Sequence, residues 1–193
     1  MKNMLFIMNP KAGRTTLKNS LVDVLEVFCN NDYAVRTYLT KSADDAERIV
    51  QEEGANYDVI VCAGGDGTLG NTVTGYMKSG IRVPLGYIPC GSTNDFARSM
   101  DIPRETVEAA EMIVKAEPFS IDIGSLNDKN FVYVAAFGMF SDTSYATPQN
   151  MKNIFGHAAY VLQGIKSLAN VPSYKMKVTI CLLYTSDAAD EAR

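Results

Sequence analysis

The strongest constraint on the fold is an alternation of two hydrophobic periods along the first half of the chain. Met4–Met8 is an unbroken apolar run, which is typical of a parallel strand buried on both faces. Apolar residues then recur at helical spacing from Leu17 to Phe28, which indicates an amphipathic helix. The same alternation predicts further strands at Tyr33–Leu39, Tyr57–Cys62 and Pro84–Ile88 and further helices at Ala43–Gln51 and Thr68–Met77. This order predicts a doubly wound α/β sheet.

The pattern changes after a predicted helix at about Arg104–Ala116. Two runs of β-branched and aromatic residues follow, Phe119–Gly124 and Asn130–Phe137, and the segment Leu126–Lys129 between them predicts a hairpin loop. The later predicted elements are a helix at Phe155–Leu168 and a strand at Tyr174–Ile180. The second half of the chain is therefore expected to open a β-rich domain.

The last thirteen residues differ in character from the rest. Eleven consecutive residues, Cys181–Glu191, resemble the translation of a sequencing adapter of the kind found at the broken ends of assembled genes. We expect an α/β domain over residues 1–118, an incomplete β-rich domain over residues 119–180 and a non-native tail over residues 181–193. The alternative is a natural polar tail.

Charge and cysteine usage exclude several classes of protein. A net charge of -4, from 18 basic and 22 acidic residues, argues against a broad basic surface that wraps nucleic acid. Phe131–Phe140, the longest later stretch without charge, is about half a membrane span, so we expect a soluble chain that touches a membrane only at its surface. The four cysteines are Cys29, Cys62, Cys90 and Cys181. Their scattered spacing, with a single histidine at His157, predicts reduced thiols in a cytoplasmic protein and no zinc site.

The first of three polar loops, Asn9–Arg14, follows the first predicted strand directly. Gly13 permits a tight turn, and Lys11 and Arg14 supply positive charge beside the free amides of a helix start. These features indicate a phosphate site. The alternative is an ordinary turn between a strand and a helix.

The second loop, Gly64–Thr68, follows the third predicted strand and opens a helix. Its three glycines let backbone amides approach a polyphosphate, and Thr68 can cap the helix or bond a phosphate oxygen. Asp66 is unusual, because a carboxylate beside phosphates repels them unless Mg²⁺ intervenes. We therefore predict a metal-binding or nucleotide-orienting role for Asp66, with a helix cap as the alternative.

The third loop, Pro89–Phe96, crowds Ser92, Thr93, Asn94 and Asp95 into one turn, which is more polar groups than capping needs. The alternative is a capped helix with an Asx turn. Ser92 lacks the G-x-S-x-G elbow of a serine nucleophile, and a Walker A loop is absent from the sequence. Gly65–Gly70 matches G-x-G-x-x-G, but it follows the third strand and has no acidic partner about twenty residues on, so it is a weak signal for dinucleotide binding.

Together, Asn9–Gly13, Gly64–Thr68 and Gly91–Ala97 resemble the catalytic domain of the diacylglycerol kinase family, which includes bacterial lipid kinases and sphingosine kinases. The resemblance extends from about Asn3 to Ile180. It implies an NAD kinase-like nucleotide-binding domain followed by the beginning of a β-sandwich domain. The family usually has Asn-Glu where this sequence has Gly70-Asn71, so Asn71 stands in place of the usual Glu and could still form a hydrogen bond there.

The resemblance implies that ATP lies across the first loop, Thr40 and the segment from Gly65 to Asn71, with the third loop nearby. The implied nucleotide-binding residues are Asn9, Pro10, Lys11, Ala12, Gly13, Thr40, Gly64, Gly65, Asp66, Gly67, Thr68, Leu69, Asn71, Ser92, Thr93, Asn94 and Asp95. Asp66 is also the candidate catalytic residue and the candidate Mg²⁺ ligand.

The implied reaction is transfer of the γ-phosphoryl of ATP to a lipid hydroxyl, most directly from diacylglycerol to phosphatidic acid. The implied location is the cytoplasm, peripheral at the inner membrane face. The family's general base comes from the second domain, beyond the end of this chain, so we expect the 193-residue chain to be inactive. The alternatives are an NAD kinase, which shares the Gly-Gly-Asp-Gly loop, and a non-catalytic nucleotide-binding module.

Overall fold

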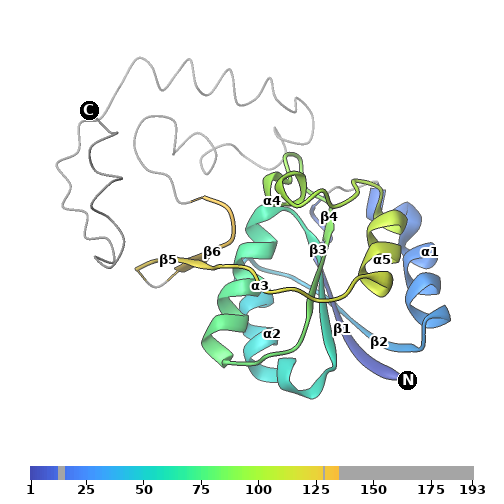
Figure 1. The fold of residues 1–193 in the computed structure, drawn as a ribbon, viewed down its shortest axis with the longest axis horizontal. Helices are drawn as coiled ribbons and strands as arrows, with labels where there is room; N and C mark the ends of the chain where they lie inside the picture. The colour runs from blue at the N-terminus through green and yellow to red at the C-terminus, as the bar shows by residue number, and fades with distance from the viewer. Residues whose placement is uncertain (13–15, 128, 135–193) are drawn as a thin grey trace, which may run out of the picture.

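A computed structural model of the protein describes residues 1–12, 16–127 and 129–134. Within these residues, four parallel strands form one sheet with helices on both faces (Figure 1). The strands are β1 (Lys2–Met8), β2 (Tyr33–Leu39), β3 (Val59–Gly64) and β4 (Leu85–Pro89), in the spatial order β2-β1-β3-β4. The predicted doubly wound α/β sheet is confirmed.

The central strands are apolar because both faces of the sheet are covered. In β1, Met4, Phe6 and Met8 pack into the hydrophobic cluster on one face. Leu5 and Ile7 alternate with them and pack into the cluster on the other face. All five residues are buried, which explains why the run shows no polar alternation.

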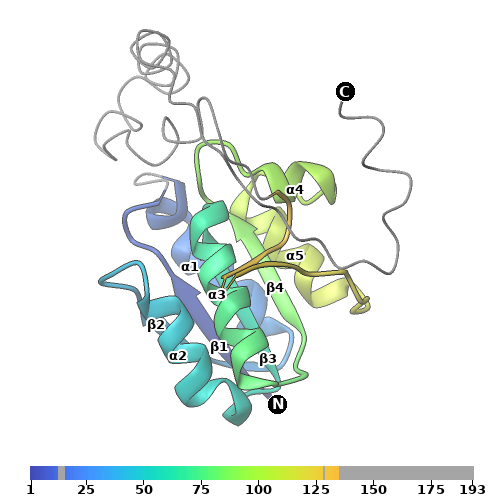
Figure 2. The same ribbon diagram turned by 90° about the vertical axis from the view of Figure 1, so that its left-hand side faces the viewer.

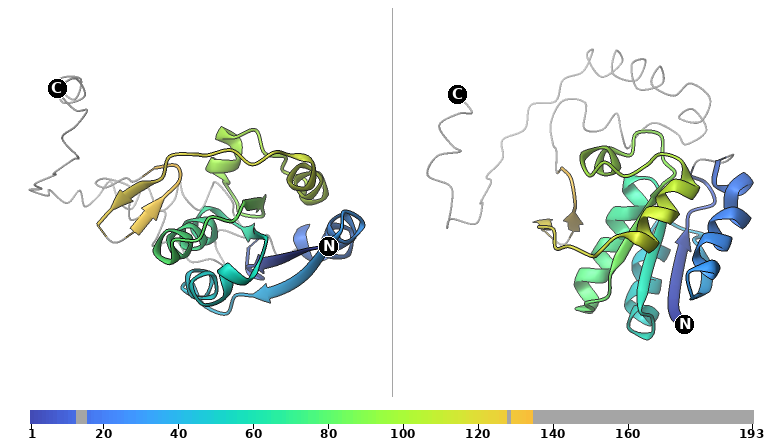
Figure 3. Two further views of the ribbon diagram at one scale, coloured as in Figure 1. Left: turned by 60° about the horizontal axis from the view of Figure 1, so that its bottom comes forward. Right: turned by 45° about the vertical axis from the view of Figure 1, so that its right-hand side comes forward.

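Helices cover both faces of the sheet, and the left-hand view in Figure 3 shows the layers end-on. One layer contains α1 (Thr16–Asn30) and α5 (Thr106–Lys115), which a 2.6 Å hydrogen bond joins through the hydroxyls of Ser20 and Thr106. The other layer contains α2 (Asp45–Glu53) and α3 (Asp66–Ser79), which face the viewer in Figure 2. These two helices approach closely at Gly75, where an added Cβ would lie 2.4 Å from the carbonyl oxygen of Glu47.

The bounds of β3 and α3 differ from those expected. The strand runs two residues further, to Gly64, and the helix begins at Asp66 instead of Thr68. Gly65 is therefore the single residue that links strand to helix, so the second loop is much tighter than predicted. Two short helices, η1 (Gly54–Asn56) and α4 (Asp95–Ser99), complete the α/β layers.

The strand predicted at Phe119–Gly124 is wrong, because only Gly124 lies in a strand, β5 (Gly124–Leu126). Phe119 and Ile121 are exposed, at 68% and 40%, and only Ile123 of the apolar residues packs on the core. The run has the composition of a strand, but none of the strands in the described part of the chain bonds to it.

The predicted hairpin is confirmed, but its bounds differ. Leu126 and Lys129, expected in the loop, lie in the strands, and the second strand ends at Phe131. Residues 135–137 of the predicted second strand lie outside the described residues. β5 pairs antiparallel with β6 (Lys129–Phe131), with Leu126 opposite Lys129. Asn127 in the turn has a positive φ of 53°, which asparagine tolerates. The hairpin lies beside α3 in Figure 1, where the amide of Asn130 donates to the hydroxyl of Thr74 over 3.4 Å.

The remaining predictions fall on residues that the structure does not describe. They are the helix at Phe155–Leu168, the strand at Tyr174–Ile180 and the tail over residues 181–193. The division of the chain near residue 118 also stays a prediction. Among the described helices, none combines the length and the apolar character needed to cross a bilayer.

Candidate functional site

The strand order creates a topological switch point between β1 and β3 at one end of the sheet. β1 and β3 are neighbours, yet the chain leaves β1 through α1 toward β2 and leaves β3 through α3 toward β4. In open α/β sheets, ligands bind at such a switch point, outside the carboxyl ends of the strands. We call the end of the sheet at Met8, Gly64 and Pro89 the carboxyl edge. All three candidate loops begin there.

The side chain of Asn9 joins the first loop to the second. Its Nδ2 donates to Oγ1 of Thr68 over 3.0 Å, and its Oδ1 accepts the amide of Lys11 at 2.9 Å. Thr68 therefore does not cap α3, as one prediction had it. The residue before α3 is Gly65, which has no side chain to cap with, and its carbonyl accepts the amide of Thr68 at 2.9 Å.

The second and third loops touch through their backbones. A Cβ added at Gly91 would lie 2.6 Å from the Cα of Gly65, so no side chain fits between the loops at this point. The amide of Cys90 donates to the carbonyl of Gly64 over 2.7 Å and extends the pairing of β3 with β4 into the loops. Glycine at positions 65 and 91 lets the second and third loops approach each other this closely.

Asn94 closes the third loop on itself. Its Oδ1 accepts the amide of Gly91 at 2.7 Å, and its Nδ2 donates to the carbonyl of the same residue at 2.9 Å. Asn94 is buried and has a φ of 53° and a ψ of 54°, in the left-handed region. The polar crowding at this turn therefore includes the local Asx-type closure that we kept as an alternative.

The carboxylate of Asp66 reaches across to the third loop. It accepts the backbone amides of Asp95 at 3.2 Å and Phe96 at 3.3 Å, and the hydroxyl of Thr93 at 3.3 Å. Asp66 thus caps the start of α4, where a negative charge is favourable. A carboxylate has about four acceptor positions, and three are used here. Counting only bonds from the described residues, one position remains for a further ligand.

Open space lies over the first turns of α3. A Cβ added at Gly67 or Gly70 would meet no described atom within 4 Å. The amide of Thr68 is already bonded to Gly65, but the amides of Asp66 and Gly67 precede any possible partner inside the helix, so this end of α3 offers donors to an anion. Small residues, free donors and open space are what a polyphosphate needs.

A magnesium ion also fits the donor set, with few protein ligands. No group of three or more His, Cys, Asp or Glu side chains gathers within the described residues. Mg²⁺ usually binds one or two carboxylates together with substrate phosphates and water. Asp66 can supply one such carboxylate at the start of α3.

Tyr87 is a residue of this site that the sequence reasoning missed. Its hydroxyl donates to the carbonyl of Gly64 over 3.1 Å and lies 3.4 Å from Oδ1 of Asn94. Burial, and secondarily the charge of Asp66, raises the pKa of Tyr87, so its hydroxyl keeps its proton. The available signal was a tyrosine in a strand that is otherwise apolar.

Asn71 stands where the family usually has glutamate, and its side chain forms a hydrogen bond at this position. Its Nδ2 donates to the carbonyl of Ala43 over 2.7 Å, which ties the loop after β2 to α3. Thr40, in the same loop, is buried, and its amide donates to Met8 at 2.9 Å. This corner of the carboxyl edge is therefore built from segments far apart in the sequence.

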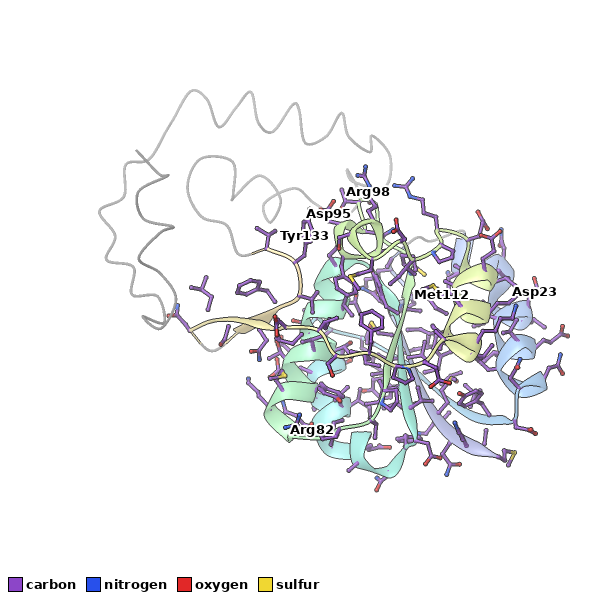
Figure 4. All side chains as sticks on the ribbon, viewed as in Figure 1. Asp23, Arg82, Asp95, Arg98, Met112 and Tyr133 are labelled. Atoms are coloured by element: carbon purple, nitrogen blue, oxygen red, sulfur yellow. The ribbon has the colours of Figure 1, made fainter. Side chains whose placement is uncertain are left out.

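The other predicted site residues divide by exposure. Lys11 and Ser92 are exposed, Pro10 is partly exposed, Ala12 and Leu69 are buried, and Gly13 lies outside the described residues. Figure 4 shows Asp95 and Arg98 of α4 at the carboxyl edge, with Arg82 at the opposite end of the sheet.

Burial raises the pKa of Cys62 and of Cys90 to about 12, so both remain thiols.

Known proteins show the same fold and sequence pattern. Residues 3–126 match the family described as the diacylglycerol kinase catalytic domain. The chain is 36% identical over 180 residues to the diacylglycerol kinase of Bacillus subtilis strain 168, covering 92% of this chain and 59% of that protein. It is 35% identical over 181 residues to the diacylglycerol kinase of Staphylococcus aureus strain JH9, covering 92% and 56%.

A solved structure agrees with these sequence relatives. The crystal structure of a diacylglycerol kinase from Bacillus anthracis strain Sterne matches with a TM-score of 0.63 and 32% identity, over 67% of this chain and 45% of that one. The chain spans less than three-fifths of the length of the curated relatives above. Because the family match includes all three loops of the carboxyl edge, the chain belongs to the diacylglycerol kinase catalytic domain family.

Proposed function

We propose that the whole protein is an ATP-dependent lipid kinase that phosphorylates a lipid hydroxyl, most directly diacylglycerol to phosphatidic acid. The observation that carries this proposal is the meeting of three loops over the open amino end of α3. The names of the two sequence relatives support the class of reaction and the choice of lipid.

The ATP phosphates lie against the first amides of α3, in the space left by Gly67 and Gly70. Lys11, exposed in the first loop, supplies positive charge beside them. Asp66 would hold Mg²⁺ through its remaining acceptor position, where the ion would supply charge neutralisation for the phosphates. The residues of this chain thus bind and orient the nucleotide, which is the larger part of catalysis in phosphoryl transfer.

In the reaction, a bond forms between the lipid hydroxyl oxygen and the γ-phosphorus, and the bond from that phosphorus to the β,γ-bridging oxygen breaks. ADP leaves, and the hydroxyl proton passes to a general base. We assign that base to the remainder of the full-length protein, so the 193-residue chain alone binds ATP without transferring phosphate. The shares of 59% and 56% that the chain covers of its relatives support this division.

The protein acts from the cytoplasm as a peripheral protein at the inner membrane face. ATP is a cytoplasmic substrate and diacylglycerol is a membrane lipid, so a kinase that joins them works at that surface. The absence of a suitable membrane-crossing helix from the described residues is compatible with surface contact.

The test is a transfer assay with the full-length protein, γ-labelled ATP, Mg²⁺ and vesicles that contain diacylglycerol. We expect labelled phosphatidic acid, and no label when the 193-residue chain replaces the full-length protein. NAD and a sphingoid base are offered in parallel. Label in NADP instead of lipid, or nucleotide binding with no transfer to any acceptor, would contradict the proposal.

A further inference from the structure

The peptide group between Gly64 and Gly65 has one defined orientation. The carbonyl of Gly64 accepts two hydrogen bonds from the side of β4, from the amide of Cys90 at 2.7 Å and from the hydroxyl of Tyr87 at 3.1 Å. A trans peptide is planar, and its C=O and N–H point in opposite directions. The amide of Gly65 therefore points away from β4.

This direction leads toward the switch point between β1 and β3. β3 lies between β4 and β1, so a donor that points away from β4 points to the side of β1, where Asn9 follows the strand. The preceding carbonyl, of Ala63, points to that same side and accepts the amide of Asn9 at 3.0 Å. The amide of Gly65 is thus directed to the place where the first and second loops meet.

Tyr87 is rigidly held and well placed to fix this orientation. Its side chain is 4% exposed and packs with Cys62, Leu69 and Phe96. Its ring lies 6.1 Å from the ring of Phe96, so one side chain contacts β3, α3 and α4 together. Its hydroxyl also lies 3.4 Å from Asn94, which closes the third loop.

We infer that Tyr87 is a positioning residue for the phosphates of ATP, acting through the peptide between Gly64 and Gly65 and without touching the nucleotide. This inference rests on the proposed function, because it assumes that the phosphates lie at the start of α3. It gives Tyr87 a role that is separate from core packing, since the ring provides the packing and the hydroxyl provides the orientation.

The chain contains a matched control for the hydroxyl. Tyr76, on α3, donates to the carbonyl of Val83 over 2.8 Å at the opposite end of the sheet. Tyr87→Phe and Tyr76→Phe each remove one hydroxyl and one hydrogen bond to a backbone carbonyl. A purely structural role predicts the same behaviour from both variants.

The experiment titrates the chain and the two variants with ATP in the presence of Mg²⁺, and separately with adenosine. We expect Tyr87→Phe to weaken ATP binding about fivefold to tenfold, the equivalent of one hydrogen bond. It should leave adenosine binding unchanged, because adenosine has no phosphate. Tyr76→Phe should change neither ligand, and the two variants should show similar shifts in thermal unfolding.

Three results would overturn the inference. They are a Tyr87→Phe variant that binds ATP as tightly as the unsubstituted chain, an equal loss of ATP and adenosine, and an equal loss of ATP in both variants. If the unsubstituted chain binds no ATP, the proposed nucleotide site itself is wrong, and the role of Tyr87 is rejected with it.

Discussion

The two ends of the parallel sheet differ in what their polar contacts do. At the amino edge, where the strands begin, the bonds close the sheet, as when the amide of Asn3 donates to Asp58 and the amide of Asp58 donates back to Asn3. At the carboxyl edge, side chains such as Asn9 and Asp66 join one loop to another. The amino edge stabilises the fold, whereas the carboxyl edge fixes the geometry of an open site.

The glycines show the same contrast. Gly80, at the end of α3 nearest the amino edge, has a φ of 68°, which gives glycine a conformational reason to be there. Gly67 and Gly70 lie inside α3 with ordinary negative φ, and each weakens the helix relative to alanine. Glycine at these two positions serves access to the backbone and not the stability of the helix.

The largest expected effect is from removing the carboxylate of Asp66. Asp66→Ala should abolish phosphoryl transfer by the full-length protein, because both the candidate metal ligand and the cap of α4 are lost. It should also lower the free energy of unfolding by about 1–2 kcal/mol, as losing a cap does. A transfer assay and urea denaturation measure the two effects.

The control for Asp66 lies at the amino edge. Asp58→Ala removes a carboxylate that accepts the amide of Asn3 at 2.7 Å. It should reduce stability by about 1 kcal/mol and leave transfer unchanged. Equal losses of transfer in the two variants would mean that the edges do not differ in function.

Next in size is Gly91→Ala. The new Cβ would lie 2.6 Å from the Cα of Gly65 and 2.7 Å from Oδ1 of Asn94, so the two loops must separate. We expect a loss of about 1–3 kcal/mol in stability and a weakening of ATP binding by about tenfold. Calorimetric titration with ATP and denaturation give the two numbers.

Gly80→Ala is the matched change at the other edge. Its Cβ meets no described atom within 4 Å, but a positive φ costs alanine about 1 kcal/mol. Its ATP affinity should equal that of the unsubstituted chain. The comparison of the edges fails if Gly80→Ala weakens ATP binding as much as Gly91→Ala does.

A smaller change with opposite signs is expected at Gly67. Gly67→Ala should raise the stability of α3 by up to about 1 kcal/mol, because alanine favours the helix and space is available. The same methyl group should weaken ATP binding, because it would occupy the place that we propose for a phosphate. Gly70→Ala, three residues on, should gain similar stability with a smaller loss of affinity. Unchanged ATP binding in Gly67→Ala would remove the phosphates from this turn.

The smallest effect concerns the corner after β2. The carboxylate of Asp45 accepts the amides of Lys41 at 2.6 Å and Ser42 at 3.1 Å, which lowers its pKa from 3.8 to about 2. A carboxyl group whose pKa is lowered by folding stabilises the folded state at any pH above its ordinary pKa of 3.8. This stabilisation is lost as the pH falls through about 2. Asp45→Asn should therefore be less stable than the unsubstituted chain at neutral pH. Denaturation at successively lower pH should show the difference shrinking, and a constant difference would contradict this assignment.

Elements buried on both faces could be predicted from the sequence. Met4–Met8 lies within the observed β1, because burial on both faces leaves a local hydrophobic pattern. Tyr33–Leu39 matches β2, which is partly exposed along its length, so its prediction depended on composition more than on burial. The run at Phe119–Gly124 has a similar composition and is nevertheless irregular up to Gly124. Its outcome depends on whether a neighbouring strand is available, which local pattern does not reveal.

The positions of the loops were predictable, but their contacts were not. Each of the three loops follows a predicted strand of a doubly wound sheet, and the loops do lie at the carboxyl ends of the parallel strands β1, β3 and β4. That Asp66 caps α4 instead of its own helix depends on how two loops lie against each other in three dimensions. The hydrogen bond from Tyr87 to Gly64 could not be predicted for the same reason. The register of β3 against β4 brings the two residues together, and the sequence does not reveal that register.

The most direct test of the central claim is to follow the backbone amides of the isotope-labelled chain by NMR during a titration with ATP and Mg²⁺. If ATP binds at the carboxyl edge, the largest shift changes occur at Gly65, Asp66 and Gly67. The amides of Asp58 and Gly80, toward the amino edge, should not shift. Shift changes centred on the amino edge, or none at Gly65–Gly67 when ATP is bound, would show that the nucleotide does not bind at the start of α3.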